Sequence, residues 1–252
     1  MTPVPTADQA VIDATRYDAV VFDLDGVVTD TASVHSRAWR RLFDEFLTAR
    51  PAARDEDHSA FTDEDYLRYV DGRSRYDGVR TFLASRGIEV DEATVRGLGD
   101  RKDHYFLRSL EEEGTHAFPG TVALIGQLAA SGLSYAVISA SRNCADVLAA
   151  AGLQDVFDVR VDGLAARELG LAGKPDPAVF LVAAHRLGVT PSRTVVVEDA
   201  LAGVEAGRAG GFGLVIGVDR DDHADELTAH GADLVVADLA EVSVVPEYEP
   251  AR

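Results

Sequence analysis

Two aspartates, Asp23 and Asp25, follow the apolar run Ala19–Phe22 and stand two residues apart. Residues two apart in an extended segment point to the same side, so both carboxylates can face one substrate. A carboxylate can attack phosphorus and form an acyl phosphate. We therefore interpret Asp23 as a candidate nucleophile and Asp25 as a candidate proton donor and acceptor. An Asp-Gly turn after a strand is common, so the pattern gains weight only from matching polar residues elsewhere in the chain.

Matching polar residues end two later apolar runs. Ser139 follows one of them, and the adjacent Glu198 and Asp199 follow another. Lys174, one of only two lysines in the chain, lies between these runs and directly before a proline, which restricts the loop. Ligands of open α/β sheets bind outside the carboxyl ends of the strands. We therefore expect these side chains to meet Asp23 at one edge of a sheet.

Short apolar runs recur along the chain and predict the strands of that sheet. Continuous runs of this kind are typical of parallel strands buried on both faces. Segments with helical apolar spacing, such as Thr121–Ala130 and Pro177–Leu187, lie between them and end at glycine. The alternation predicts a doubly wound α/β fold with a mostly parallel, Rossmann-like sheet. The predicted strands are Ala19–Phe22, Tyr135–Ile138, Thr194–Val197, Gly213–Ile216 and Asp233–Val236.

One long interval interrupts this alternation and has no comparable strand run. A crossover between strands needs far fewer residues, so we predict a helical cap at 31–117, inserted after the first core strand. The α/β core then comprises 1–30 and 118–252, with the cap over the carboxyl edge of its sheet. The predicted cap helices are Ala32–Thr48, Thr62–Val70, Tyr76–Arg86 and Asp91–Glu113.

The carboxylates expected at this edge require a cation, because Asp23, Asp25, Glu198 and Asp199 would otherwise repel one another. Oxygen-only ligands favour a hard divalent ion, and Mg²⁺ typically shares its coordination shell with phosphate. An ammonium group and a hydroxyl beside the metal suit a phosphoryl group. The expected cofactor is therefore Mg²⁺.

The overall composition excludes several classes of function. The chain has 46% hydrophobic residues, 27% charged residues and a formal net charge of −19, which would repel nucleic acid and anionic membranes. Its apolar runs are far shorter than the roughly 18 residues that span a bilayer. No secretory leader pattern is evident, and Cys144 is the only cysteine, so we expect a cytoplasmic protein. We interpret Cys144 as a small helix residue and Trp39 as a packing residue.

The combined motifs resemble those of the haloacid-dehalogenase-like phosphotransferases. The segment 22–31 resembles their first motif, Ser139 the second, Lys174 the third, and Glu198-Asp199 the fourth. The similarity extends from about Tyr17 to Asp238. Within the superfamily, the sequence is most similar to β-phosphoglucomutases and related sugar-phosphate phosphatases.

This resemblance implies a role for each matching residue. Asp23 would be the nucleophile and Asp25 the acid/base, and Mg²⁺ would be bound by Asp23, the Asp25 carbonyl and Asp199, with Glu198 beside it. Ser139, Ala140 and Lys174 would bind the transferring phosphate. The second phosphate of a sugar bisphosphate would be bound by Arg75, Ser141 and Asn143. Further matching substrate or cap residues are Thr31, His35, Lys102 and Arg142.

The sequence departs from the family pattern at Asp71 and Arg142, where the family often has lysine. Arg73 is the nearest cation able to offset Asp71.

Three functions remain as hypotheses. The first is a Mg²⁺-dependent mutase that converts β-glucose 1-phosphate to glucose 6-phosphate through an aspartyl-phosphate and a bisphosphate intermediate. The second is a sugar-phosphate phosphatase in which Asp25 activates water. The third is a non-enzymatic phospho-receiver domain, against which the long insertion and the nucleophile on the first core strand both argue. The expected partner is a phosphorylated sugar, and the expected state is a monomer or weak oligomer.

Overall fold

A parallel sheet of six strands forms the centre of the α/β part of the molecule, with the strand order β4-β3-β2-β5-β6-β7. The computed structural model describes residues 10–51, 55–220 and 222–246. Each strand pairs in parallel with its neighbours. The bounds are β2 Ala19–Asp23, β3 Ser134–Ile138, β4 Val159–Val161, β5 Thr194–Glu198, β6 Leu214–Val218 and β7 Leu234–Val236. The five predicted strand runs correspond to β2, β3, β5, β6 and β7, and the predicted α/β fold is confirmed.

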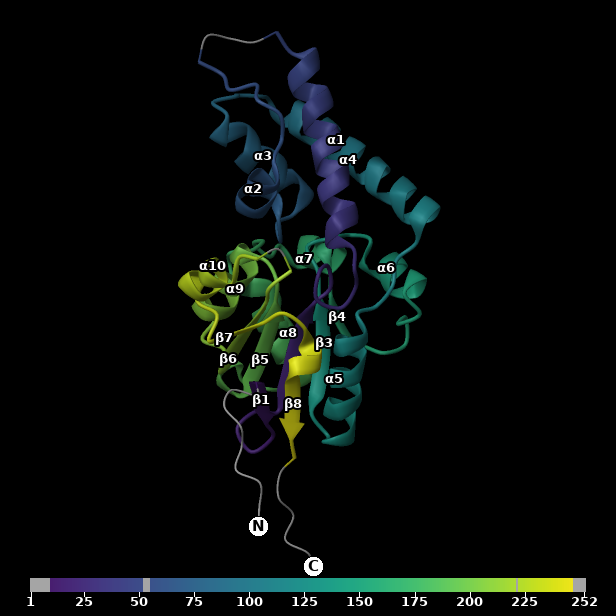
Figure 1. Cartoon of the computed structure of the whole chain (residues 1–252), viewed down its shortest axis with the longest axis vertical. Coiled ribbons are helices and arrows are strands. Elements are labelled where there is room, and N and C mark those ends of the chain that lie inside the picture. Colours follow the sequence, from purple (N-terminus) through teal and green to yellow (C-terminus); the bar gives the residue numbers. More distant parts are fainter. Residues whose placement is uncertain (1–9, 52–54, 221, 247–252) are drawn as a thin grey trace, which may run out of the picture.

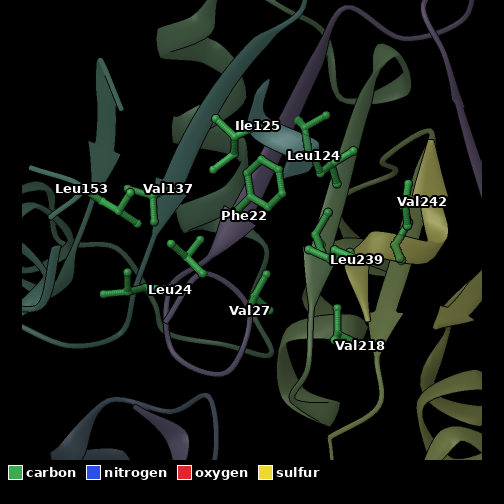
Figure 2. Close-up of a cluster of buried hydrophobic side chains, with 14 of the residues drawn as sticks. Phe22, Leu24, Val27, Leu124, Ile125, Val137, Leu153, Val218, Leu239 and Val242 are labelled. Carbon is green, nitrogen blue, oxygen red and sulfur yellow. The ribbon is translucent and has the colours of Figure 1, made fainter. Parts of the chain in front are cut away.

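Apolar side chains cover the sheet on both faces, which is why its central strands read as unbroken apolar runs. Phe22 points to one face, where Leu124, Ile125 and Val137 lie around it (Figure 2). Val21, the residue before it, packs on the opposite face with Phe180. The flanking helices are α5 Pro119–Ala130, α6 Cys144–Ala150, α7 Gly163–Leu169, α8 Ala178–Leu187, α9 Leu201–Ala209 and α10 Ala224–His230.

Three strands were missed by the sequence interpretation. β4 is a three-residue edge strand interrupted by the exposed Arg160. β1 (Ala10–Asp13) and β8 (Val242–Val245) form a separate two-stranded parallel sheet. These strands are short and partly exposed, so they lack the continuous apolar run that identifies a buried strand. Short 3₁₀ turns, η2 (Pro191–Arg193) and η3 (Leu239–Glu241), precede β5 and β8.

A layer of helices lies over the carboxyl edge of the sheet (Figure 1). It contains α1 Ala32–Ala49, α2 Asp63–Asp65, the π-helix η1 Tyr66–Val70, α3 Arg75–Ser85 and α4 Glu92–Glu113. These helices surround an apolar cluster of their own, which includes Trp39, Phe43 and Phe82. The four helical segments predicted between 31 and 117 are present, although 62–70 forms one α turn followed by a π-helix. The boundaries given for the core, 1–30 and 118–252, and for the cap, 31–117, remain a prediction from the sequence.

Local capping places the helices that carry site residues. The Ser74 side chain accepts a hydrogen bond from the Asp77 amide, and α3 therefore begins at Arg75. Asp91 accepts one from the Thr94 amide and begins α4, the helix of Lys102. Among the described residues, no helix is long and apolar enough to cross a membrane.

Candidate active site

Asp23 ends β2, at the middle of the carboxyl edge of the sheet, and is paired with Lys174. The Lys174 Nζ atom lies 2.5 Å from Asp23 Oδ1 and also contacts the Glu198 carboxylate. The Asp25 amide donates to Asp23 Oδ2 at 2.9 Å. Burial raises the pKa of Asp23 well above its usual range, although Lys174 opposes this effect. Burial by itself would lower the pKa of Lys174, but the charges of Asp23 and Glu198 outweigh it and raise that pKa.

Asp25 lies beside Asp23 and is surrounded by donors. Thr31, the residue before α1, donates its hydroxyl to Asp25 Oδ1 at 2.5 Å, and Ser139 donates to Asp25 Oδ2 at 3.1 Å. His35, one helical turn after Thr31, places Nε2 3.4 Å from Asp25 Oδ1. Burial alone would raise the pKa of Asp25, but His35 and Thr31 outweigh it and hold that pKa well below its usual range. Asp25 is therefore a carboxylate that can accept a proton.

The chain's second lysine, Lys102, projects from α4 toward the same carboxylate. Its Nζ atom contacts His35 Nδ1 and lies 5.1 Å from the ring centres of both Trp39 and Phe106. Burial lowers the pKa of Lys102 to about 7, and the nearby Arg75 contributes. Trp39 stacks on a neighbouring aromatic ring of its own layer, as a packing residue would, and also lines the active-site cavity.

The loop after β3 folds back on itself through its hydroxyl groups. The Ser141 amide donates to Ser139 Oγ at 3.0 Å, and the Asn143 amide donates to Ser141 Oγ at 3.1 Å. The Asn143 side chain donates to Asp103 Oδ1 at 2.8 Å, and Arg75 Nη1 lies 2.5 Å from Asp103 Oδ2. Arg75 and Asn143, predicted to bind one phosphate, are therefore brought together around a carboxylate.

Asp199 follows β5 and packs directly against the glycine of the first motif. A Cβ atom on Gly26 would lie 1.6 Å from Asp199 Oδ2, and Gly26 has φ +87°, so this position requires glycine. Burial raises the pKa of Asp199 well above its usual range, and the charges of Asp71, Glu198 and Asp23 add to this. Asp199 therefore lies in a strongly negative environment.

Many of these side chains line a cavity of about 60 Å³ between the two layers. Arg142 is exposed and lines a neighbouring cavity of about 420 Å³, which Ser139 and Lys174 also line. Cys144 is buried in α6, where burial raises the pKa of its thiol, in keeping with a structural role. The residues that line the cavity of about 60 Å³ include Asp23, Asp25, His35, Trp39, Tyr66, Asp71, Arg73, Arg75, Lys102, Asp103, Ala140, Ser141 and Asp199.

Sequence interpretation missed two of the polar lining residues, Tyr66 and Asp103. Asp103 could have been found from its place directly after Lys102 in the same cap segment. Tyr66 carries no sequence signal beyond its position in a predicted helix. Asp71 was noted only as a departure from a family pattern, yet it lies close enough to Asp199 to affect its pKa.

The sequence that forms this site matches a known protein family. The family model of the haloacid dehalogenase-like hydrolases matches residues 17–211. The chain belongs to this family. It is an enzyme of the phosphotransferase or phosphatase type, as the resemblance in its motifs predicted.

Individual proteins are similar to this chain over nearly its whole length. The β-phosphoglucomutase of Mycobacterium bovis is 47% identical, with 90% of this chain and 92% of that protein aligned. Hexitol phosphatase A of Escherichia coli is 30% identical, covering 92% of this chain and 96% of that protein. The crystal structure of β-phosphoglucomutase from Clostridium difficile superposes with a TM-score of 0.72 at 26% identity, covering 89% and 92% of the two chains.

Proposed function

We propose that this enzyme transfers a phosphoryl group through Asp23 and converts β-glucose 1-phosphate to glucose 6-phosphate. The observation that carries the proposal is the pairing of Asp23 with Lys174 at the end of the central strand, with Asp25 beside it and a helical layer above. The Mycobacterium bovis β-phosphoglucomutase, 47% identical over 90% of this chain, supports the choice of substrate. That the chain is a sugar-phosphate mutase or phosphatase of its family rests on the same relatives.

The reaction divides into two transfers that use Asp23 and Asp25 in opposite directions. In the first, the C6 hydroxyl of β-glucose 1-phosphate attacks the phosphorus of phosphorylated Asp23, the Asp23–phosphorus bond breaks, and Asp25 accepts the hydroxyl proton. The resulting bisphosphate reorients. In the second, Asp23 attacks the phosphorus at C1, the bond from that phosphorus to the C1 oxygen breaks, and Asp25 returns the proton to this oxygen. The low pKa of Asp25 keeps it ionised before the first transfer, as a proton acceptor must be.

Other residues of the site would position the transferring group. Lys174 supplies a positive charge next to Asp23, and the Ser139 hydroxyl and the Ala140 amide lie at the end of the neighbouring strand. Such fixed donors stabilise negative charge that develops on phosphoryl oxygens. The cavity of about 60 Å³ is small compared with the roughly 300–1,000 Å³ of pockets that bind small ligands. The neighbouring cavity of about 420 Å³ is of that size and is lined by Ser139, Ala140 and Lys174, so a sugar phosphate would extend into it. Closure of the helical layer over the bound sugar would exclude water.

The residues present fit a bound Mg²⁺ ion. Lys174 contacts Asp23 and Glu198, whereas Asp199 faces Asp71 and the same two acids, and burial raises its pKa further. A further cation is therefore favoured beside Asp199. Asp23, the Asp25 carbonyl and Asp199 would hold the ion, with Glu198 beside it, and when bound it would offset charge on the transferring phosphate.

The site has no ready-made carboxylate cage for the ion. Across 10–51, 55–220 and 222–246, no group of three His, Cys, Asp or Glu side chains is arranged to hold a metal. This agrees with Mg²⁺, which takes only one or two protein carboxylates and completes its shell with water and phosphate oxygens.

A sugar-phosphate phosphatase is the second candidate, and Asp71 favours it. This carboxylate lines the cavity, where it would repel the second phosphate of a bisphosphate. The similarity to hexitol phosphatase A of Escherichia coli, at 30% identity, supports this candidate. In this reaction Asp25 would activate water instead of a sugar hydroxyl.

Phosphorus NMR of β-glucose 1-phosphate, with Mg²⁺ and a catalytic amount of glucose 1,6-bisphosphate, tests both candidates. Glucose 6-phosphate as product supports the mutase, and free phosphate alone supports the phosphatase. Asp23→Asn should lower turnover by at least about 10⁴-fold, because an amide cannot attack phosphorus. Asp30→Asn makes the same change in the following loop and should have nearly wild-type activity, since Asp30 has 41% of its side chain exposed. Normal turnover by Asp23→Asn would exclude the mechanism.

A further inference from the structure

Asp103 occupies the groups that the proposed function assigns to the second phosphate of the substrate. One of its carboxylate oxygens accepts from the Asn143 side chain at 2.8 Å, and the other lies 2.5 Å from Arg75 Nη1. Arg75 begins α3 and Asp103 lies on α4, whereas Asn143 precedes α6 in the core. The carboxylate therefore joins the helical layer to the core at the place where an anion is expected.

A second phosphate cannot use these groups while Asp103 remains between them. Only 10% of the Arg75 side chain is exposed, so few alternative positions beside the guanidinium are open to another anion. A phosphate and a carboxylate bound to the same guanidinium would also repel each other strongly in this partly buried site. A ligand with a second phosphate must therefore displace Asp103, whereas one without it leaves the pair intact.

We propose that Asp103 is a specificity-determining residue that competes with the second phosphate of the substrate for Arg75 and Asn143. The proposal rests on the proposed function, because it requires a substrate or intermediate with two phosphates. In the absence of that phosphate, Asp103 holds the helical layer against the core through Asn143. Binding of the second phosphate releases this contact and replaces it with its own.

Removal of the Asp103 charge should therefore strengthen binding of a bisphosphate. The test uses calorimetric titration with glucose 1,6-bisphosphate in the Asp23→Asn background, which prevents turnover. We expect Asp103→Asn to lower Kd by about tenfold or more, since a charge-assisted bond no longer has to be exchanged. Asp100→Asn is the matched control: it removes the same charge about one turn earlier on α4, where Asp100 accepts from the Tyr76 hydroxyl. Its Kd should stay within about twofold of the parent value.

A double-mutant cycle tests whether the competition acts through Arg75. In an Arg75→Ala background, Asp103→Asn should no longer improve the Kd, because the group for which it competes is absent. Hydrolysis of p-nitrophenyl phosphate, a substrate with one phosphate, gives the comparison on the otherwise unchanged enzyme: Asp103→Asn should not lower its KM, because no second phosphate is present to compete with Asp103. A purely structural role for Asp103 would not produce this difference between a ligand with two phosphates and a substrate with one.

Each outcome decides the proposal. Unchanged or weaker bisphosphate binding in Asp103→Asn would overturn it while leaving the proposed function intact. Failure of every variant and of the parent to bind bisphosphate would overturn the second-phosphate site and, with it, the mutase. Thermal melting verifies folding, and Asp103→Ser replaces Asp103→Asn in the same measurements if the asparagine variant is unfolded.

Discussion

The two lysines of the chain allow a paired test, because both are buried in opposite surroundings. Lys174 is 4% exposed and lies between the carboxylates of Asp23 and Glu198, while Lys102 is 5% exposed and lies against His35 and aromatic rings. Methionine keeps an unbranched apolar stem and removes the charge. We expect Lys174→Met to destabilise the protein strongly, and Lys102→Met to leave it at least as stable as the wild type.

The Lys174→Met variant leaves two buried carboxylates without their cation. Removing one partner of a buried ion pair costs about 3–5 kcal/mol. At about 2–4 °C per kcal/mol for a chain of this size, Tm should fall by about 6–20 °C. Without Lys174, the pKa of Asp23, already raised by burial, rises further above its unfolded value. The folded state then binds protons more readily than the unfolded state. The loss of stability in Lys174→Met should therefore be larger at about pH 8 than at about pH 5.

For Lys102, the expected effect of pH on stability has the opposite sign. Burial lowers its pKa from the usual 10.5 to about 7. At 1.36 kcal/mol per pH unit, this difference corresponds to about 5 kcal/mol of unfavourable folding free energy below pH 7. Between about pH 7 and pH 10.5, the unfolded chain binds a proton at Lys102 that the folded protein does not, so the stability of the wild type rises with pH. Lys102→Met removes this dependence, and its advantage should be greatest at about pH 6 and disappear near about pH 10.

Urea denaturation followed by circular dichroism measures both variants. Chelator is included so that a bound cation cannot compensate for the missing lysine, and the wild type is measured at the same pH values. A Lys174→Met variant as stable as the wild type at about pH 8 would refute the reasoning. The same conclusion would follow if Lys102→Met lost as much stability as Lys174→Met.

Two further changes test the acidic side of the site. Asp199→Asn should raise the Mg²⁺ concentration needed for half-maximal activity by about tenfold or more, because it removes an anionic ligand; a Mg²⁺ titration of turnover measures this, and full wild-type activity in excess chelator would contradict it. Gly26→Ala should cost at least about 1–2 kcal/mol in a urea melt, because φ is +87° and the added Cβ atom meets the Asp199 carboxylate. Gly97→Ala is the control, since open space surrounds Gly97 on α4 and alanine should stabilise that helix by about 0.5–1 kcal/mol; equal effects of the two glycine changes would contradict the steric argument.

The sequence determined the sheet and the position of its polar edge. Unbroken apolar runs identified the strands that are buried on both faces, such as β2 and β5. Because the carboxyl ends of parallel strands meet at one edge of the sheet, the sequence predicted that the residues after these runs lie close together. The small strands β1, β4 and β8 could not be recognised, because exposed or short strands lack that run.

The long-range contacts of the site side chains were decided by the tertiary structure. Asp103 directly follows Lys102 in the sequence, yet its carboxylate reaches a core residue 40 positions further along the chain, and only the packing of the helical layer on the core brings the two together. The two lysines look alike in the sequence, but one has a raised pKa and the other a lowered one. A pKa depends on burial and on the charges that packing brings within a few ångströms. These long-range contacts therefore decide what an identical residue type does at two positions.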